Sequence, residues 1–168
     1  LATDEIWAEA LALGDAPLLV VTGGEALEHP GLVPLLEAAL ERWPRIEVET
    51  SGIKPPPLSH PRLAWNVSPK LPAATARWRD TWAHVASWIA EPRATFKIVA
   101  GDPPDLDDAA RLIAEHGLPR ERVMLMPEGL TAAALAARAE ALAAASERLG
   151  VRVSPRLHVE LWGARRGV

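Results

Sequence analysis

The sequence predicts an α/β fold in which a mainly parallel sheet curves into a partial β/α barrel with a polar interior. Segments with strand character alternate with segments of helical character along the whole chain, as in parallel sheets with right-handed crossovers. Several strands have one polar side, whereas strands that are buried on both faces are nearly continuous apolar runs. The strands end in polar or glycine-containing turns, which is where α/β proteins bind ligands.

The length and composition favour one domain over residues 1–168. Hydrophobic residues make up 49% and charged residues 24% of the chain, as is typical of a folded domain. The net charge of −4 gives no reason to expect a nucleic-acid partner. No apolar run approaches the ~18 residues of a membrane helix. Cysteine is absent, which excludes disulfides and thiolate-bound metals within these residues. We expect a cytoplasmic protein with no membrane partner.

The chain opens with a helix, a strand and a second helix. Residues 3–13 place apolar side chains at helical spacing behind Thr3, which can cap the helix. The apolar run 18–22 predicts a strand that ends in a glycine-rich turn. The next helix covers residues 31–43, with leucines along one side, and Pro44 stops it.

Two strands with polar sides and a tryptophan-rich helix follow. Residues 45–50 alternate between polar and apolar side chains, and residues 63–68 include two polar side chains on one face. Residues 76–90 predict one helix, because two tryptophans, a valine and an isoleucine recur at helical spacing. Such a tryptophan stripe is typical of a core or an interface.

The fourth strand and its helix carry charged residues. The strand 94–100 sets Lys97 between two apolar neighbours, and Asp105 is expected to cap a helix that Gly117 ends. The acidic residues around this helix start are Asp102, Asp105, Asp107 and Asp108. They resemble a metal site, but a helix dipole also favours acidic side chains in its first turn, which is the simpler interpretation.

The carboxyl-terminal part supplies two more strands. Residues 123–126 predict the fifth, and Thr131 caps the long alanine-rich helix that follows. Residues 151–162 alternate and predict a last strand with Arg156 and His158 on its polar side. A barrel whose polar sides line a ligand-binding interior fits these alternations, and a sheet with one solvated face is the alternative.

Five motifs at the strand ends carry a resemblance to a known family. They are Thr22-Gly23-Gly24-Glu25, Glu49-Thr50-Ser51-Gly52, Val67-Ser68-Pro69-Lys70, Met126-Pro127-Glu128-Gly129 and Pro155-Arg156-Leu157-His158-Val159. In this order they resemble the strand ends of 7-carboxy-7-deazaguanine synthases, which are radical S-adenosylmethionine lyases of the queuosine-precursor (7-deazaguanine) pathway. The closing segment 161–168, Leu-Trp-Gly-Ala-Arg-Arg-Gly-Val, resembles that family's carboxyl terminus. The resemblance implies a partial barrel of the radical S-adenosylmethionine type that lacks its N-terminal strand.

The resemblance also implies roles for individual residues. Gly23, Gly24 and Glu25 would hold the amino group of S-adenosylmethionine, and a carboxylate suits an ammonium group. Ser68 and Lys70 would face the cofactor's ribose and carboxylate, and Glu128 would lie near its adenine.

The implied substrate is a pterin, 6-carboxytetrahydropterin. Its pocket would be formed by Thr50, Gly52, His158 and the terminal carboxylate of Val168. Because the substrate is anionic, countercharge is expected from Arg156 or from the pair Arg165 and Arg166. The implied reaction begins with hydrogen abstraction by a 5′-deoxyadenosyl radical and continues with ring contraction and loss of ammonia.

The chain departs from the family at its cofactors. The family binds a four-iron four-sulfur cluster through three grouped cysteines and magnesium through a threonine, both before the Gly-Gly-Glu motif. This chain has no cysteine, and such a cluster needs cysteine thiolates. Ala26 also stands where the family has proline. We therefore expect the chain by itself to be inactive and to be the carboxyl-terminal part of an enzyme whose cluster-binding segment precedes Leu1.

Two other interpretations remain open. The chain is alternatively a truncated homologue that binds a ligand, or serves as a scaffold, without catalysis. A different radical S-adenosylmethionine enzyme would share only the cofactor motifs, and the closing segment argues against it. The tryptophan-striped helix and the habits of the family favour a homodimer.

Overall fold

One parallel sheet organises the structure, a computed structural model that describes residues 3–12, 14, 16–163 and 165. The order of its strands in space is also their order in the chain. Their bounds are Leu18–Val21 (β1), Arg45–Thr50 (β2), Leu63–Val67 (β3), Ala94–Ala100 (β4), Val123–Pro127 (β5) and Arg152–Val153 (β6). Neighbouring strands are parallel throughout, so each connection must cross back over the sheet. The predicted α/β class is confirmed.

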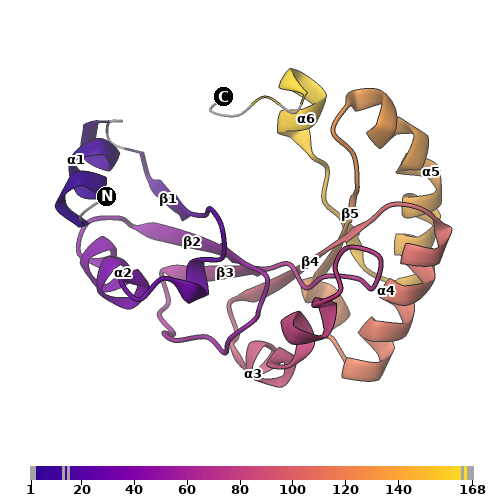
Figure 1. Cartoon of the computed structure of the whole chain (residues 1–168), viewed down its shortest axis with the longest axis horizontal. Helices are drawn as coiled ribbons and strands as arrows, with labels where there is room; N and C mark the ends of the chain where they lie inside the picture. Colours follow the sequence, from indigo (N-terminus) through magenta and orange to yellow (C-terminus); the bar gives the residue numbers. More distant parts are fainter. Residues whose placement is uncertain (1–2, 13, 15, 164, 166–168) are drawn as a thin grey trace.

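The helices leave one side of the sheet open. The α-helices are Thr3–Ala12 (α1), Leu32–Leu40 (α2), Val85–Ala90 (α3), Pro103–His116 (α4), Ala132–Leu149 (α5) and Leu157–Trp162 (α6). Short 3-10 helices cover Ala26–Glu28 (η1), Trp78–Trp82 (η2) and Arg120–Arg122 (η3). Figure 1 shows α2, α3, α4 and α5 along the convex side of the curved sheet. Because β1 and β6 do not pair with each other, the sheet is an unclosed, partial β/α barrel, as predicted.

The core lies between the convex face of the sheet and these helices. Side chains that are fully buried include Ile46, Trp65, Phe96, Ile98 and Leu125 from the strands and Leu36, Trp88 and Leu112 from the covering segments. Because side chains alternate across a strand, the residues between them face the concave side. On that side Glu47, Asn66 and Lys97 are half-buried and Glu49 is exposed. The prediction that strands present a polar face opposite an apolar one is confirmed for β2, β3 and β4.

Residues 76–90 do not form the single helix that the sequence predicts. They divide into η2 and α3, with Ala83 and His84 between them. Contacts with the loop after β3 separate the two parts, because Lys70 N donates to Thr81 Oγ1 at 2.9 Å and Trp82 Nε1 donates to Lys70 O at 2.8 Å. Trp82 and Trp88 are buried, so this tryptophan-rich segment belongs to the core.

The last predicted strand is wrong beyond Val153. Ser154 N makes one more bond to the sheet, to Leu125 O, and Pro155 then has no N–H to continue the ladder. Residues 157–162 form α6, in which Val159 is buried while Leu161 is exposed. The alternation of apolar residues there does not place them on one face.

The start of α4 also differs from expectation. Asp102, and not Asp105, occupies the cap position, and Asp105 lies in the first turn, where its carboxylate accepts a hydrogen bond from Gly101 N at 2.9 Å. No group of three His, Cys, Asp or Glu side chains among the described residues could hold a metal ion. The simpler interpretation of the acidic cluster is therefore favoured. Across the described part of the chain, no helix is long and apolar enough to cross a membrane.

Candidate functional site

The turn after β1 places a carboxylate beside the end of β2. Gly23 and Gly24 adopt positive φ angles of 109° and 57°, a region that side-chain-bearing residues rarely enter. The turn allows Glu25 to cap η1, where its Oε1 accepts a hydrogen bond from Leu27 N at 3.1 Å. The two glycines therefore fix the position of Glu25 relative to the sheet.

Glu25 is bound to the end of β2 by three further donors. The Thr50 hydroxyl donates to its Oε1, and the Ser51 hydroxyl and backbone N–H donate to its Oε2, the last at 2.8 Å. Partial burial by itself would raise the pKa of Glu25, but the hydrogen bonds from Ser51, Thr50 and Leu27 outweigh it and lower the pKa. Glu25 is thus held as a carboxylate, and its four donors match the roughly four acceptor sites of that group.

Thr50 and Gly52 support Glu25 from the covered side of the sheet. Thr50 is only 6% exposed, and its hydroxyl also accepts a hydrogen bond from Gly52 N at 3.1 Å. Gly52 has a φ of +85°, and a Cβ there would lie 2.9 Å from Val67 Cγ1. Thr50 therefore contacts Glu25 directly and Gly52 contacts Thr50, and Thr50 does not face the concave side where Glu49 lies.

Ser68 and Lys70 follow β3 directly. Lys70 Nζ donates to Ser68 Oγ at 3.3 Å, and its backbone is tied to η2 by the bonds of Thr81 and Trp82 described above. Burial lowers the pKa of Lys70, while the nearby carboxylates of Glu25 and Glu49 oppose this effect. Lys70 therefore lies close enough to Glu25 and Glu49 for their charges to act on it.

A pocket of about 330 Å³ opens at the carboxyl ends of β3, β4 and β5. Lys70, after β3, and Glu128, after β5, line it on its two sides. Asp105 of α4 and the apolar side chains of Leu71 and Val99 also line it. The pocket thus combines apolar walls with charged groups of both signs, as ligand sites commonly do. Glu128 is exposed, so its carboxylate is open to a ligand.

The concave face carries polar residues that were predicted to line the interior of the barrel but have no individual role by the family resemblance. Thr22 Oγ1 donates to Glu49 Oε2 at 2.9 Å, and Asn66 Nδ2 donates to Glu47 Oε2 at 3.0 Å. Lys97 extends this polar surface onto β4, in a smaller cavity of 130 Å³ that Glu49 and Asn66 also line. The signal that indicated these residues was the alternation of polar side chains along the strands.

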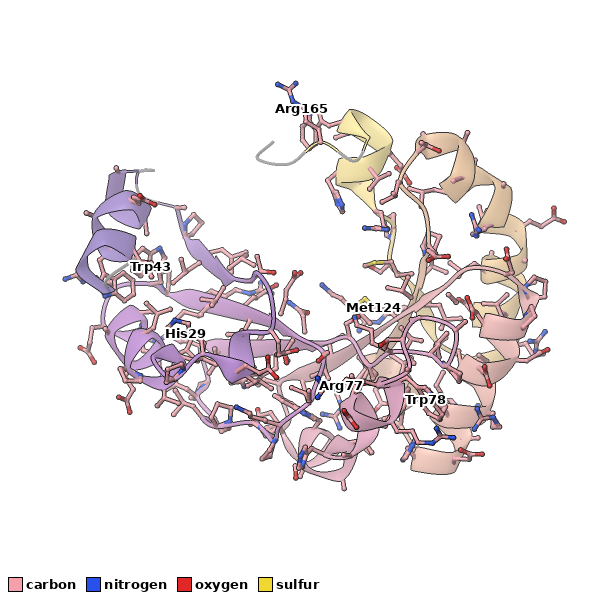
Figure 2. The ribbon with its side chains drawn as sticks, viewed as in Figure 1. His29, Trp43, Arg77, Trp78, Met124 and Arg165 are labelled. Carbon is pink, nitrogen blue, oxygen red and sulfur yellow. The ribbon has the colours of Figure 1, made fainter. Side chains whose placement is uncertain are left out.

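His158 lies apart from the other predicted substrate residues. It is exposed on α6, which stands across the open side of the barrel from β1 and β2 (Figure 1). Its neighbour Arg156 donates to Gly129 O at 2.9 Å. Val168 and Arg166 lie outside the described residues, and Arg165 is exposed beyond α6 (Figure 2). The structure therefore does not bring His158 together with Thr50.

The residues present fit some of the expected cofactors and not others. The charged pocket near Lys70 and the anionic Glu25 suit a zwitterionic ligand such as an amino acid derivative. An iron–sulfur cluster does not fit, because its usual ligands are cysteine thiolates and the chain has no cysteine. Magnesium likewise has no group of three candidate ligands among the described residues.

Comparison with known proteins identifies the family. No family model matches the chain. The chain is 38% identical over 168 residues to a 7-carboxy-7-deazaguanine synthase of Pyrobaculum aerophilum, covering 98% of this chain and 73% of that protein. Synthases of the same name from Halobacterium salinarum and Chlorobaculum tepidum are each 33% identical, over 96% and 95% of this chain and 71% of each relative. The resemblance read from the strand ends is thereby confirmed, and the chain belongs to the 7-carboxy-7-deazaguanine synthase family of deazapurine-biosynthesis enzymes.

Proposed function

We propose that this chain forms the ligand-binding part of an enzyme that converts 6-carboxytetrahydropterin to 7-carboxy-7-deazaguanine with S-adenosylmethionine as cofactor. The observation that carries the proposal is that Lys70, after β3, and Glu128, after β5, line one 330 Å³ pocket, while Glu25 lies after β1 at the same carboxyl-terminal edge of the sheet. The family membership supplies the reaction, and the residues below supply the binding.

The amino acid part of S-adenosylmethionine is proposed to lie over the turn after β1 and the loop after β3. The backbone of Gly23 and Gly24 offers carbonyl groups to its ammonium, and the anionic Glu25 provides the matching field. The Lys70 ammonium pairs with the cofactor's carboxylate, with Ser68 beside it to meet the ribose. Because Lys70 is partly buried, such a pair is worth more than one on the surface.

The adenine is proposed to lie in the pocket between Leu71, Val99 and Glu128. An apolar wall suits the faces of the ring, and the exposed carboxylate of Glu128 can accept a hydrogen bond from the exocyclic amine. When bound, S-adenosylmethionine supplies the hydrogen-abstracting radical of this enzyme family. The chain contributes no cysteine ligand for the cluster that reduces it, so the protein's role here is to bind and orient.

The pterin is proposed to bind above the polar concave face. Thr50 would act on it through Glu25, to which its hydroxyl donates, and Gly52 through Thr50, to whose hydroxyl its N–H donates. His158 and the carboxylate of Val168 would close the pocket from the carboxyl-terminal side. For His158 this requires α6 to approach the barrel opening when the substrate is present.

The experiment that tests the proposal uses the purified natural protein that carries this chain. After anaerobic reconstitution with iron and sulfide, it is incubated with S-adenosylmethionine, a reductant and 6-carboxytetrahydropterin. Mass spectrometry should then detect 7-carboxy-7-deazaguanine. Calorimetric titration with S-adenosylmethionine should show one site on the unreconstituted protein. Absence of both product and cofactor binding would refute the proposal.

A second candidate function is ligand binding without turnover. The observation that favours it is the complete lack of cysteine in the 168 residues. It predicts that the natural protein binds S-adenosylmethionine or the pterin but, after the same reconstitution, contains no iron and forms no product. Iron analysis and the product assay therefore separate the two functions.

We also propose that the protein forms a homodimer. The tryptophans of residues 76–90 do not support it, because Trp82 and Trp88 are buried in the core. Large apolar side chains are exposed instead on α6, where Leu157, Leu161 and Trp162 are 58%, 59% and 52% exposed. Light scattering after gel filtration measures the mass, and a monomer at micromolar concentration would exclude this partner.

A further inference from the structure

Two groups of opposite charge lie beside Gly101, directly after β4. A Cβ at Gly101 would lie 2.7 Å from Glu128 Oε2 and 3.6 Å from Arg138 Nε. The Glu128 carboxylate and the Arg138 guanidinium therefore border the same small space, which Gly101 leaves empty. Glu128 follows β5, whereas Arg138 reaches this space from α5. Arg138 belongs to none of the motifs at the strand ends.

Arg138 is half-buried but makes only long hydrogen bonds. Its Nη1 donates to Ala134 O and its Nη2 to Asp102 Oδ1, both at 3.4 Å, whereas a good N–H···O bond measures about 2.7–3.2 Å. Its Nε is buried and has no hydrogen-bond partner in the part of the chain that the structure describes. A buried N–H group without a partner is costly, so we expect this donor to gain an acceptor when the neighbouring pocket is filled.

Glu128 is the acceptor that can reach this donor. Its backbone is fixed, because Glu128 N donates to Ala100 O at 2.9 Å. Its side chain is exposed and lines the 330 Å³ pocket. No ion pair within the described ranges includes Glu128. Its carboxylate can therefore turn about its own side-chain bonds without breaking an ion pair.

The two other carboxylates near Arg138 are less suited to this bond. Asp105 Oδ2 already accepts a hydrogen bond from Gly101 N at 2.9 Å. Asp102 is 77% exposed and 3.4 Å from the guanidinium, where solvent screens its charge. Neither residue lies as close as Glu128 to the space that Gly101 leaves empty.

We propose that Arg138 is a positioning residue that orients the Glu128 carboxylate in the pocket. A rotation of the Glu128 side chain brings Oε2 to the Arg138 Nε–H, and the missing side chain at Gly101 leaves room for the two to meet. Oε1 then remains available to a donor on the ligand. This inference rests on the proposed function, in which that donor is the 6-amino group of adenine. Because one oxygen is held by a cation and the other faces the ring edge, the pocket prefers a purine with a 6-amino group to one without it.

The test compares two ligands that differ only at position 6 of the purine. The purified protein and its Arg138→Met variant are titrated by calorimetry with S-adenosylhomocysteine and with the analogue in which a hydrogen replaces the 6-amino group. The unaltered protein should bind S-adenosylhomocysteine about tenfold more tightly than the analogue. Arg138→Met should reduce this preference to less than about threefold and leave the affinity for the analogue within about twofold. Arg138→Lys keeps a cationic donor and should retain most of the preference.

A double variant tests whether Arg138 acts through Glu128. Glu128→Gln should also lose most of the preference, and adding Arg138→Met to it should cause no further loss, because the two residues act as one unit. A further loss in the double variant would show that Arg138 acts without Glu128 and would overturn the inference. Arg148→Met is the matched control, since it removes a positive charge from an exposed position on the same helix. It should change neither affinity.

The remaining outcomes separate this inference from the proposed function. A preserved preference in Arg138→Met, or an equal loss of both affinities, would overturn the positioning role and leave the proposed function intact. Equal affinities of the unaltered protein for the two ligands would also overturn it, while cofactor binding through Lys70 would stand. If the unaltered protein binds neither ligand, the proposed function fails and this inference with it. Unfolding midpoints of the variants that match the unaltered protein confirm that the fold is retained.

Discussion

Replacing Glu25 by glutamine tests whether its carboxylate joins the turn after β1 to the end of β2. Glutamine has nearly the same shape, but one of its two terminal groups donates where the carboxylate accepts. Oε1 receives Leu27 N and the Thr50 hydroxyl, and Oε2 receives Ser51 N and the Ser51 hydroxyl. Whichever way the amide is oriented, one pair of donors faces an N–H group.

The magnitude follows from that pairing. A hydroxyl can rotate and accept from the amide, but a backbone N–H cannot, so one backbone donor loses its partner at a cost of about 1–3 kcal/mol. The bonds that remain lose their charge assistance, about 1 kcal/mol more. We expect Glu25→Gln to lower the free energy of unfolding by about 2–4 kcal/mol in total. For a domain of this size that corresponds to a fall in melting temperature of roughly 4–16 °C.

Equilibrium urea unfolding at pH 7 measures the change, and the matched control is Glu28→Gln. Glu28 belongs to the same 3-10 helix but is exposed, so its substitution should change the free energy by less than about 0.5 kcal/mol. The pH dependence gives a second measurement. Because the pKa of Glu25 is lowered in the folded protein, its contribution is present above the unfolded pKa of ~4.3 and is lost as the pH falls below it.

The variant should therefore lose less stability than the unaltered protein between pH 5 and pH 3. If Glu25→Gln unfolds at the same urea concentration as the unaltered protein, the four hydrogen bonds contribute no net stability. If the two proteins have parallel acid profiles, the carboxylate is not held in its charged form. Either result would refute the reasoning.

Three further substitutions test other parts of the site. Lys70→Met should weaken S-adenosylmethionine binding about tenfold in calorimetry, because a partly buried ion pair is lost, while the melting temperature stays unchanged; unaltered affinity would remove Lys70 from the site. Gly52→Ala should destabilise the protein by about 2–4 kcal/mol in urea unfolding, since φ is +85° and the new Cβ would lie 2.9 Å from Val67 Cγ1; a neutral result would show that the turn can relax. His158→Ala in the natural protein should leave the affinity for S-adenosylmethionine unchanged and lower pterin turnover at least tenfold; the opposite pattern would contradict its assignment to the substrate.

The fold was largely predictable because local and global signals agree along most of the chain. Strand 45–50 alternates, and strand 94–100 does so around Lys97, and both were confirmed residue for residue as β2 and β4. The failures occur where tertiary contacts override the local pattern. The helix predicted over 76–90 is divided because its side chains bond to the loop that carries Lys70. The strand predicted over 151–162 ends early because Pro155 has no N–H with which to extend the ladder. Of the apolar residues at 157, 159 and 161, only Val159 is buried.

The sequence predicted which residues lie at the strand ends, but not which hydrogen bonds they make with one another. Ligand-side residues gather at the carboxyl ends of parallel strands, so the positions of Glu25, Lys70 and Glu128 at one edge followed from the topology. Which donors each group meets depends on turns that the sequence does not specify. The hydrogen bond between Thr50 and Glu25 joins two strand ends through the conformation of the two glycines before Glu25, and no periodicity encodes it.

The saturation of Glu25 constrains how the site can bind an amine. Its four donors leave no free acceptor position, so a ligand ammonium can bond to the carboxylate only if a present donor leaves. The backbone N–H groups of Leu27 and Ser51 are fixed by the chain, whereas the hydroxyls of Thr50 and Ser51 can rotate about their own bonds. An incoming ammonium would therefore displace a hydroxyl and replace a neutral donor by a charged one, which strengthens the bond. The backbone N–H groups of Leu27 and Ser51 would keep Glu25 in place during this exchange. Thr50 is buried on the convex side of β2, so a change in its hydrogen bond to Glu25 would transmit cofactor binding to the core.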